Sequence, residues 1–154
     1  MSNLIRNGNF STPSITANSS LLYDSFTTAQ KTNLIWLGGD YSNSQNINLI
    51  NGSNAQFVYQ NPSVIGVSQY LQLRFNASIS QTINITEAGR YLLSFYYCKR
   101  VPNTSNQPTY IYFDNILIAT LQSTIPETWT LYSIEVNVKT RGNKLLKLHQ
   151  PISI

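Results

Sequence analysis

The sequence has few of the residues on which most protein chemistry depends. Its 154 residues include one cysteine, one histidine and six acidic residues. A single cysteine excludes a disulfide within the chain. The clusters of Cys and His that bind zinc and the alternating acids of an EF-hand loop are both missing, and the lone His149 has no nucleophile motif beside it. We therefore expect no catalysis and no resident cofactor.

Charge is scarce as well. Charged residues make up 10% of the chain, against about 25% in typical domains, and the net charge is +4. The basic residues are scattered and gather only at two places, Lys99 with Arg100 and a C-terminal set of Lys139, Arg141, Lys144 and Lys147. No zinc-ligand set, basic helix or RNP-like stretch accompanies them, so we expect no nucleic-acid partner. The surface must be built from Asn, Ser, Thr, Gln and Tyr, which suits sugars or close subunit packing.

Long apolar runs are also missing. No stretch approaches the roughly 20 apolar residues of a membrane helix, so we expect no membrane insertion. The start, "MSNLIRNGNF", lacks the apolar run of a signal peptide. We expect a chain that is made in the cytosol or cut from a longer secreted precursor, and a cell-surface, extracellular or virion location stays open.

The length fits one domain over residues 1–154, without a repeat or linker.

Alternation with a period of two dominates the pattern, and helix-type spacing is nearly absent. Between residues 78 and 86, Ile79, Gln81, Ile83 and Ile85 fall on one side and polar residues on the other. Similar strands are predicted at residues 70–75, 91–98, 109–114 and 131–138, and weaker ones at 4–5, 21–26, 33–37, 46–50, 57–59, 116–121 and 144–149. Turn motifs separate them every eight to twelve residues. The pattern predicts an all-β, antiparallel β-sandwich of the jelly-roll type.

Tyrosines form the candidate ligand-binding surface. If Ile111 and Phe113 face the core, Tyr110 and Tyr112 face outward together, and Tyr96 joins them. Tyrosine offers a flat face for a sugar ring and a hydroxyl for hydrogen bonding. Gln72 and Arg74 alternate outward from the apolar positions of their strand. The predicted binding residues are Tyr110, Tyr112, Tyr96, Tyr70, Arg74 and Gln72, with Trp36 and Tyr41 as looser members.

An alternative interpretation of these tyrosines is that they pack under loops or at a subunit contact. Trp129 stands just before the alternation of "TLYSIEVNV", where a tryptophan more often covers a core than binds a ligand. We therefore leave Trp129 out of the predicted site.

Several stretches in fixed order resemble a known family. They are "NLIRNGNFSTP", "WLGGDYSNSQNINLING", "SQYLQL", "ASISQTI", "AGRYLLSFYYCKR" and "PETWTLYSIEVNV". Together they resemble the galactose-binding-like jelly-roll domains of plant cell-wall and bacterial surface proteins, which are relatives of carbohydrate-binding modules. The resemblance covers most of the chain. It implies a jelly-roll sandwich, no catalysis, and association with polysaccharide or with other surface proteins.

Two features depart from that family. Its members commonly carry an acidic residue just after the "NGNF"-type start and a "DN" pair on the last strand, where carboxylates help to hold calcium. Here Ser11 follows Phe10, and the ending "LHQPISI" lacks the pair. We do not carry the structural calcium site over to this chain.

Two functions follow as hypotheses. The first is a non-catalytic module that binds a glycan or polysaccharide. The alternative is a structural protein of a large-virus capsid or other surface assembly, in which the jelly roll contacts itself or neighbouring subunits. A third hypothesis, a glycan hydrolase, would need two of the six acids brought to roughly 5–9.5 Å from each other.

Overall fold

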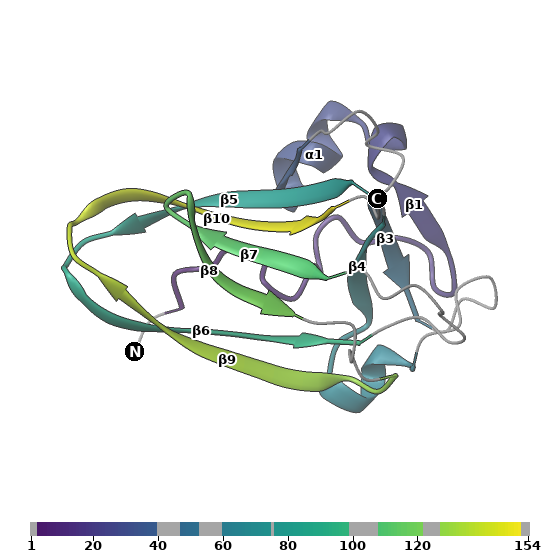
Figure 1. The fold of residues 1–154 in the computed structure, drawn as a ribbon. Helices are drawn as coiled ribbons and strands as arrows, with labels where there is room; N and C mark the ends of the chain where they lie inside the picture. The colour runs from purple at the N-terminus through teal and green to yellow at the C-terminus, as the bar shows by residue number, and fades with distance from the viewer. Residues whose placement is uncertain are drawn as a thin grey trace.

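The structure is a computed structural model that describes residues 3–39, 47–52, 60–74, 76–98, 108–121 and 127–151. These residues form short strands with little helix (Figure 1). The strands are β1 (Ser20–Leu22), β2 (Leu37–Gly39), β3 (Ile47–Asn51), β4 (Gln69–Leu73), β5 (Ala77–Ile85), β6 (Gly89–Tyr97), β7 (Thr109–Phe113), β8 (Ile116–Leu121), β9 (Thr130–Val138) and β10 (Gly142–Gln150). The helical segments are η1 (Tyr23–Ser25), α1 (Thr28–Leu34) and η3 (Pro62–Ile65).

One layer of the fold is a five-stranded antiparallel sheet in the order β2-β5-β10-β7-β8. Strands β5 and β10 pair along their whole length, from Ala77 opposite Gln150 to Ile85 opposite Gly142. The inner face of this sheet carries the buried residues Ile79, Ile83, Ile111 and Leu146. Alternate side chains of a strand point to opposite faces, so the predicted alternation at residues 78–86 is confirmed.

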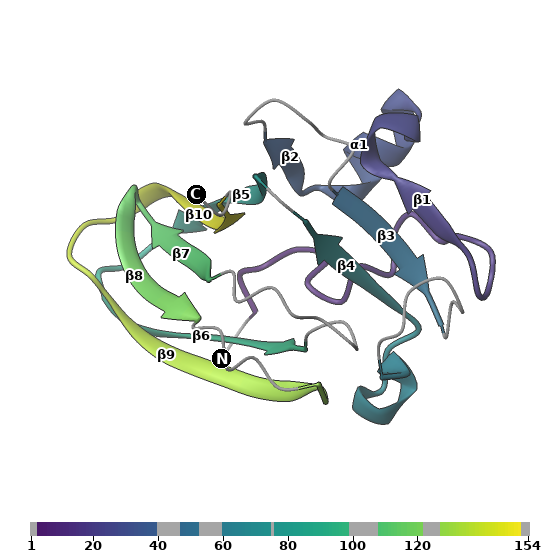
Figure 2. The same cartoon turned by 45° about the vertical axis from the view of Figure 1, so that its right-hand side comes forward.

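The opposite layer consists of two smaller sheets. Strands β6 and β9 form a nine-residue antiparallel ribbon, and β1, β3 and β4 form a second sheet in the order β1-β3-β4. Figures 1 and 2 show the β6-β9 ribbon facing the β5-β10-β7 part of the large sheet, with β3 and β4 beyond one end of the ribbon. The inward residues of the ribbon alternate along each strand: Tyr91, Leu93, Phe95 and Tyr97 on β6, and Tyr132, Ile134, Val136 and Val138 on β9.

The predicted strand at residues 33–37 is wrong, because most of it belongs to the end of α1 and the turn that follows. Thr27 caps this helix: its Oγ1 accepts a hydrogen bond from Gln30 N (3.2 Å), and Gln30 Oε1 accepts one from Thr27 N (2.8 Å). This reciprocal capping box stabilises the first turn of a helix. The chain leaves the helix at Ile35, which has a φ of 70°. The sequence signal for the start of this helix is the T-x-x-Q spacing of Thr27 and Gln30, which hydrophobic periodicity does not reveal.

Two other weak strand predictions also differ from the structure. Residues 21–26 are extended only as far as Leu22 before the chain enters η1, and residues 4–5 form no strand. The predicted strand at 57–59 lies outside the described residues, as does Phe75. The predicted strand at 116–121 is present with the same bounds, and the other remaining predicted strands are present with ends shifted by one or two residues.

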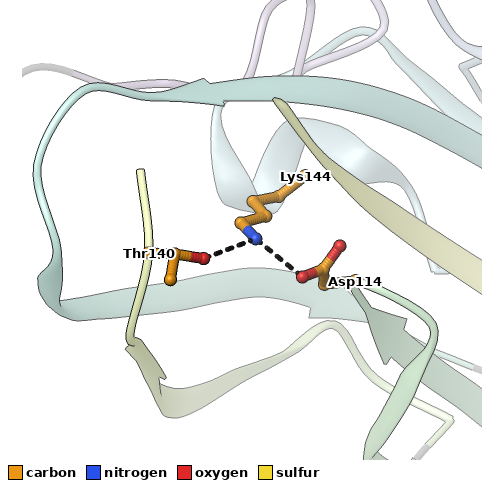
Figure 3. A network of polar contacts seen from close by, with 3 residues as sticks. All are labelled: Asp114, Thr140 and Lys144. Carbon is orange, nitrogen blue, oxygen red and sulfur yellow. Dashed lines mark hydrogen bonds and ion pairs between the residues drawn. The ribbon is translucent and has the colours of Figure 1, made fainter. Parts of the chain in front are cut away.

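Lys144 joins two turns at one end of the large sheet (Figure 3). The β7-β8 turn is made by Asp114 and Asn115, with φ of 52° and 63°, the geometry of a type I′ hairpin turn. Lys144 Nζ lies 2.8 Å from Asp114 Oδ2 and donates a hydrogen bond to Thr140 Oγ1 (3.1 Å). The side chain of Lys144 is only 13% exposed. This residue of the basic C-terminal set therefore serves a structural contact and is not a free surface charge.

Buried glutamines fasten the N-terminal segment to the sandwich. Gln81, on the inner face of β5, accepts a hydrogen bond from Arg6 N (2.8 Å) and donates one to Arg6 O (2.9 Å). Each side-chain amide offers a donor and an acceptor, so it can pair with a backbone unit as a neighbouring strand does. Gln81 is 2% exposed, and Arg6 has no strand partner among the described residues.

Gln69, at the start of β4, holds the next part of the same segment. Its Nε2 donates to Phe10 O (2.7 Å) and Pro13 O (3.1 Å), and its Oε1 accepts from Ile15 N (2.8 Å). Gln69 and Gln81 are called the glutamine clamps below. They satisfy backbone groups of the N-terminal segment, most of them partly buried, that have no strand partner among the described residues.

We expect Gln81→Leu to lower the free energy of unfolding by about 1–2 kcal/mol, because the partly buried backbone groups of Arg6 lose both partners while the side-chain volume is nearly conserved. Urea denaturation at equilibrium measures this change. Thr82→Leu, at the next and outward position of β5, is the matched control and should change stability by about 0.5 kcal/mol or less. Equal losses in the two variants would contradict the proposed role of the clamp.

Candidate functional site

Tyr110 and Tyr112 lie together on the outer face of the large sheet, as predicted. They alternate with the inward residues Ile111 and Phe113 of β7. On β10, Lys147 stands opposite Tyr112 and His149 opposite Tyr110. On β8, Thr120 stands opposite Tyr110. Directly paired residues share a face of the sheet, so these side chains form one surface across three strands. We call the set of Tyr110, Tyr112, Thr120, Lys147 and His149 the tyrosine face.

The rings of the tyrosine face touch edge to face. The centroids of Tyr110 and Tyr112 are 6.4 Å apart at an interplanar angle of 81°, and those of Tyr110 and His149 are 6.4 Å apart at 62°. Such edge-to-face pairs are favourable aromatic arrangements. All five side chains are partly exposed. The face therefore combines ordered ring surfaces with a hydroxyl from Thr120 and a cationic donor from Lys147.

The imidazole of His149 is shifted toward its neutral form. Partial burial lowers the pKa of His149 below its ordinary 6.5, and the nearby positive charge of Lys147 lowers it further. Both causes disfavour the protonated ring. At neutral pH His149 is therefore uncharged and adds no second cation to the face, and its Nε2 is buried.

Two predicted residues are exposed but lie elsewhere. Tyr96 is 48% exposed and stands on the outer face of β6, in the layer opposite the tyrosine face. Arg74 is exposed just after the end of β4. The structure therefore does not bring Tyr96 onto the surface that holds Tyr110 and Tyr112.

The predicted exposure of Tyr70 and Gln72 is wrong. They are 5% and 6% exposed, although both point away from the Leu71 side of β4 as expected. The Tyr70 ring packs edge-on against Trp129, with centroids 5.3 Å apart. Gln72 Oε1 accepts a hydrogen bond from Asn48 Nδ2 on the neighbouring β3 (2.9 Å). Alternation indicated the face correctly, but this face of β4 is covered.

Of the looser aromatic members, Trp36 is also buried, and Tyr41 lies outside the described residues. The Trp36 ring packs against Phe10, with centroids 5.7 Å apart. Trp129 is partly buried and packs on Tyr70, which agrees with its prediction as a structural residue.

A cavity of about 830 Å³, which the sequence did not predict, lies between the two layers. Consecutive residues of β4 (Gln69–Leu73) and residues 92–98 at the end of β6 border it, and inward residues of β10 line it from the large sheet. Tyr70, Gln72 and Tyr96 are among its lining residues. So is Cys98, the single cysteine, and burial raises the pKa of its thiol to about 12. The thiol is therefore protonated at neutral pH.

Within the described ranges, the structure contains no group of three His, Cys, Asp or Glu side chains placed to hold a metal ion. The acids in those ranges, Asp24, Glu87, Asp114, Glu127 and Glu135, are all exposed. None of the helices in the described part of the chain has the length and apolar character needed to cross a membrane.

Comparisons with known proteins support the fold. No family model and no curated protein matches the sequence. Among solved structures, the chain is similar to a family 35 carbohydrate-binding module from Clostridium thermocellum, with a TM-score of 0.50 and 17% identity over 86% of each chain. A second family 35 module, from an environmental isolate, has a TM-score of 0.41 and 20% identity over 50% of this chain and 56% of that chain. The first likeness confirms the antiparallel β-sandwich of the jelly-roll type that the sequence predicted.

We expect an NMR titration to give His149 a pKa below 6.5 in the folded protein. The chain has only this histidine, so its ring resonances are unambiguous. Because the pKa is lowered on folding, His149 should contribute stability above its unfolded value, and that contribution should be lost as the pH falls through the folded pKa. Lys147→Gln removes the positive charge near the imidazole and should therefore raise the pKa of His149. A value at or above 6.5 would contradict the burial described above.

Proposed function

We propose that this protein is a non-catalytic carbohydrate-binding module and that the tyrosine face is its ligand-binding surface. The observation that carries this proposal is the pair of ordered tyrosine rings, Tyr110 and Tyr112, on an outward sheet face. The solved family 35 structure with the same fold is described as a carbohydrate-binding module, which favours this class of function over others that use a sandwich.

The chemistry of the face suits a sugar better than a charged or wholly apolar ligand. A pyranose ring has an apolar side formed by its C–H groups, which stacks on an aromatic ring, and a rim of hydroxyls that need hydrogen-bond partners. Tyr110 and Tyr112 supply stacking surfaces and two phenolic hydroxyls. Thr120 and Lys147 stand opposite them and supply a hydroxyl and an ammonium group. The proposal includes no metal ion and no reacting side chain.

The other predicted residues enter this proposal differently. Tyr96 and Arg74 are exposed but stand apart from β7 in the fold, and Tyr70 and Gln72 are buried. We therefore assign ligand contact to Tyr110 and Tyr112 and none to Tyr96, which makes Tyr96 a useful control.

We expect the purified protein to bind a subset of glycans on a broad array, and Tyr110→Ala/Tyr112→Ala to weaken that binding about tenfold or more, because two stacking surfaces are removed. Tyr96→Ala, a tyrosine truncation on the opposite layer, should leave the affinity unchanged. Circular dichroism must show that all variants are folded. Saturable binding that survives the double substitution would place the glycan elsewhere, and no binding by a folded protein would exclude the proposed function.

A second candidate function, subunit assembly on a virion or other surface, is favoured by a different observation. The outer face of the β6-β9 ribbon exposes Leu92 (69%), Leu131 (55%) and Tyr96. Leu131 stands directly opposite Tyr96 across the two strands. Contiguous exposed apolar side chains of this kind often mark protein–protein contacts.

If assembly is the function, sedimentation should show a defined oligomer that Leu92→Ser/Leu131→Ser converts to a folded monomer. The double substitution removes apolar contact area without touching the tyrosine face. A wild-type protein that sediments as a monomer at all accessible concentrations would exclude this candidate.

A further inference from the structure

The cavity between the layers differs in chemistry from the tyrosine face. No Asp, Glu, Lys, Arg or His occurs among the described residues that line it. Aliphatic and aromatic side chains of β4, β6 and β10 form much of its wall, among them Leu71, Leu73, Phe95, Tyr97, Leu146 and Leu148, and uncharged polar residues such as Asn3, Asn9 and Gln150 complete it. An ionised ligand would lose its hydration there without gaining a charged partner from these described residues, which is unfavourable.

Several polar groups of the wall already have partners within the protein. The amide of Gln69 is occupied by Phe10, Pro13 and Ile15 through the glutamine clamp. Each indole N–H is also used: Trp36 Nε1 donates to Asn7 O (3.2 Å), and Trp129 Nε1 donates to Gln60 O (2.8 Å). A sugar placed there would find few of these groups available for its hydroxyls.

The space is too large to be an ordinary packing defect. Protein interiors are close-packed and contain few voids larger than a water molecule. A volume of about 830 Å³ falls instead within the range of roughly 300–1,000 Å³ that small-molecule sites occupy. Its leucine and aromatic side chains offer an apolar ligand hydrocarbon contacts that remove apolar surface from water.

We propose that the cavity bordered by β4, β6 and β10 is a binding site for an uncharged apolar small molecule, such as a fused aromatic compound or a long alkyl chain. The partly exposed side chains of Leu71, Leu73 and Leu148 contact its hydrocarbon surface. The site is separate from the glycan surface, because Leu146 and Leu148 point to the inner face of β10 while Lys147 points to the outer face. Failure of the cavity proposal would therefore leave the proposed glycan binding at the tyrosine face untouched, and the reverse also holds.

Both tryptophans of the chain line the cavity, and this provides a direct readout. The probe is N-phenyl-1-naphthylamine, an uncharged aromatic fluorophore that accepts energy from tryptophan. Titration into the folded protein should quench the emission of Trp36 and Trp129 and raise the emission of the probe, with saturation at one equivalent. Energy transfer reaches across a domain of this size, so the substitutions below, and not the transfer alone, locate the probe.

Matched substitutions locate the probe. Leu148→Gln places an amide in the cavity wall, and we expect it to weaken binding about tenfold or more. Leu117→Gln makes the same change on β8, opposite Tyr112 on the outer face, and should alter the affinity less than twofold. Leu71→Phe is a second cavity variant that reduces the free volume without adding a polar group, in case Leu148→Gln does not fold.

The outcomes separate clearly. Saturable energy transfer that either folded cavity variant weakens, and that Leu117→Gln and Tyr110→Ala/Tyr112→Ala leave intact, supports the proposal. No saturable transfer with the folded wild-type protein overturns it. Equal transfer in wild type and in the folded cavity variants also overturns it, because the probe then binds at another surface.

Discussion

The two glutamine clamps are the contacts on which the closure of this sandwich depends. The N-terminal segment has no regular strand between Arg6 and Ile15, yet it lies against the inner side of the fold and its backbone groups need partners. Gln81 and Gln69 supply these partners from side chains that are almost completely buried. Each clamp gives the backbone of the N-terminal segment the hydrogen bonds that a neighbouring strand would otherwise supply. The N-terminal segment can then pack over the core in a fixed position.

That cover has consequences for both surfaces of the large sheet. The inner face of β5 and β10 is partly filled by the clamped segment and partly left as the cavity, whose lining includes Phe10 and Gln69. The outer face of β10 stays open and carries His149 and Lys147 beside the two tyrosines. One strand thus presents an uncharged apolar lining on one side and a polar aromatic surface on the other, because alternate residues face opposite ways.

The sequence predicted the sandwich and the outward pair Tyr110 and Tyr112 because both depend on the period of two. Alternation does not report whether a face is covered, and for this reason Tyr70 and Gln72 were placed at the surface although they are buried. The alternation pattern does not predict helix α1, because the sequence signal of this helix is one pair of reciprocal hydrogen bonds between Thr27 and Gln30. The cavity depends on how far apart separate sheets lie, and Gln69 reaches partners 54 to 59 residues away, which no local pattern encodes.

The chemical nature of the clamps also determines how the fold responds to its surroundings. Amide groups carry no net charge and do not titrate, so the bonds of Gln69 and Gln81 keep their strength when protons or salt are added. Ion pairs at a surface weaken as ionic strength rises and the screening length falls below about 10 Å. A sandwich closed by buried amides should therefore hold its N-terminal cover equally well in dilute and in concentrated electrolyte.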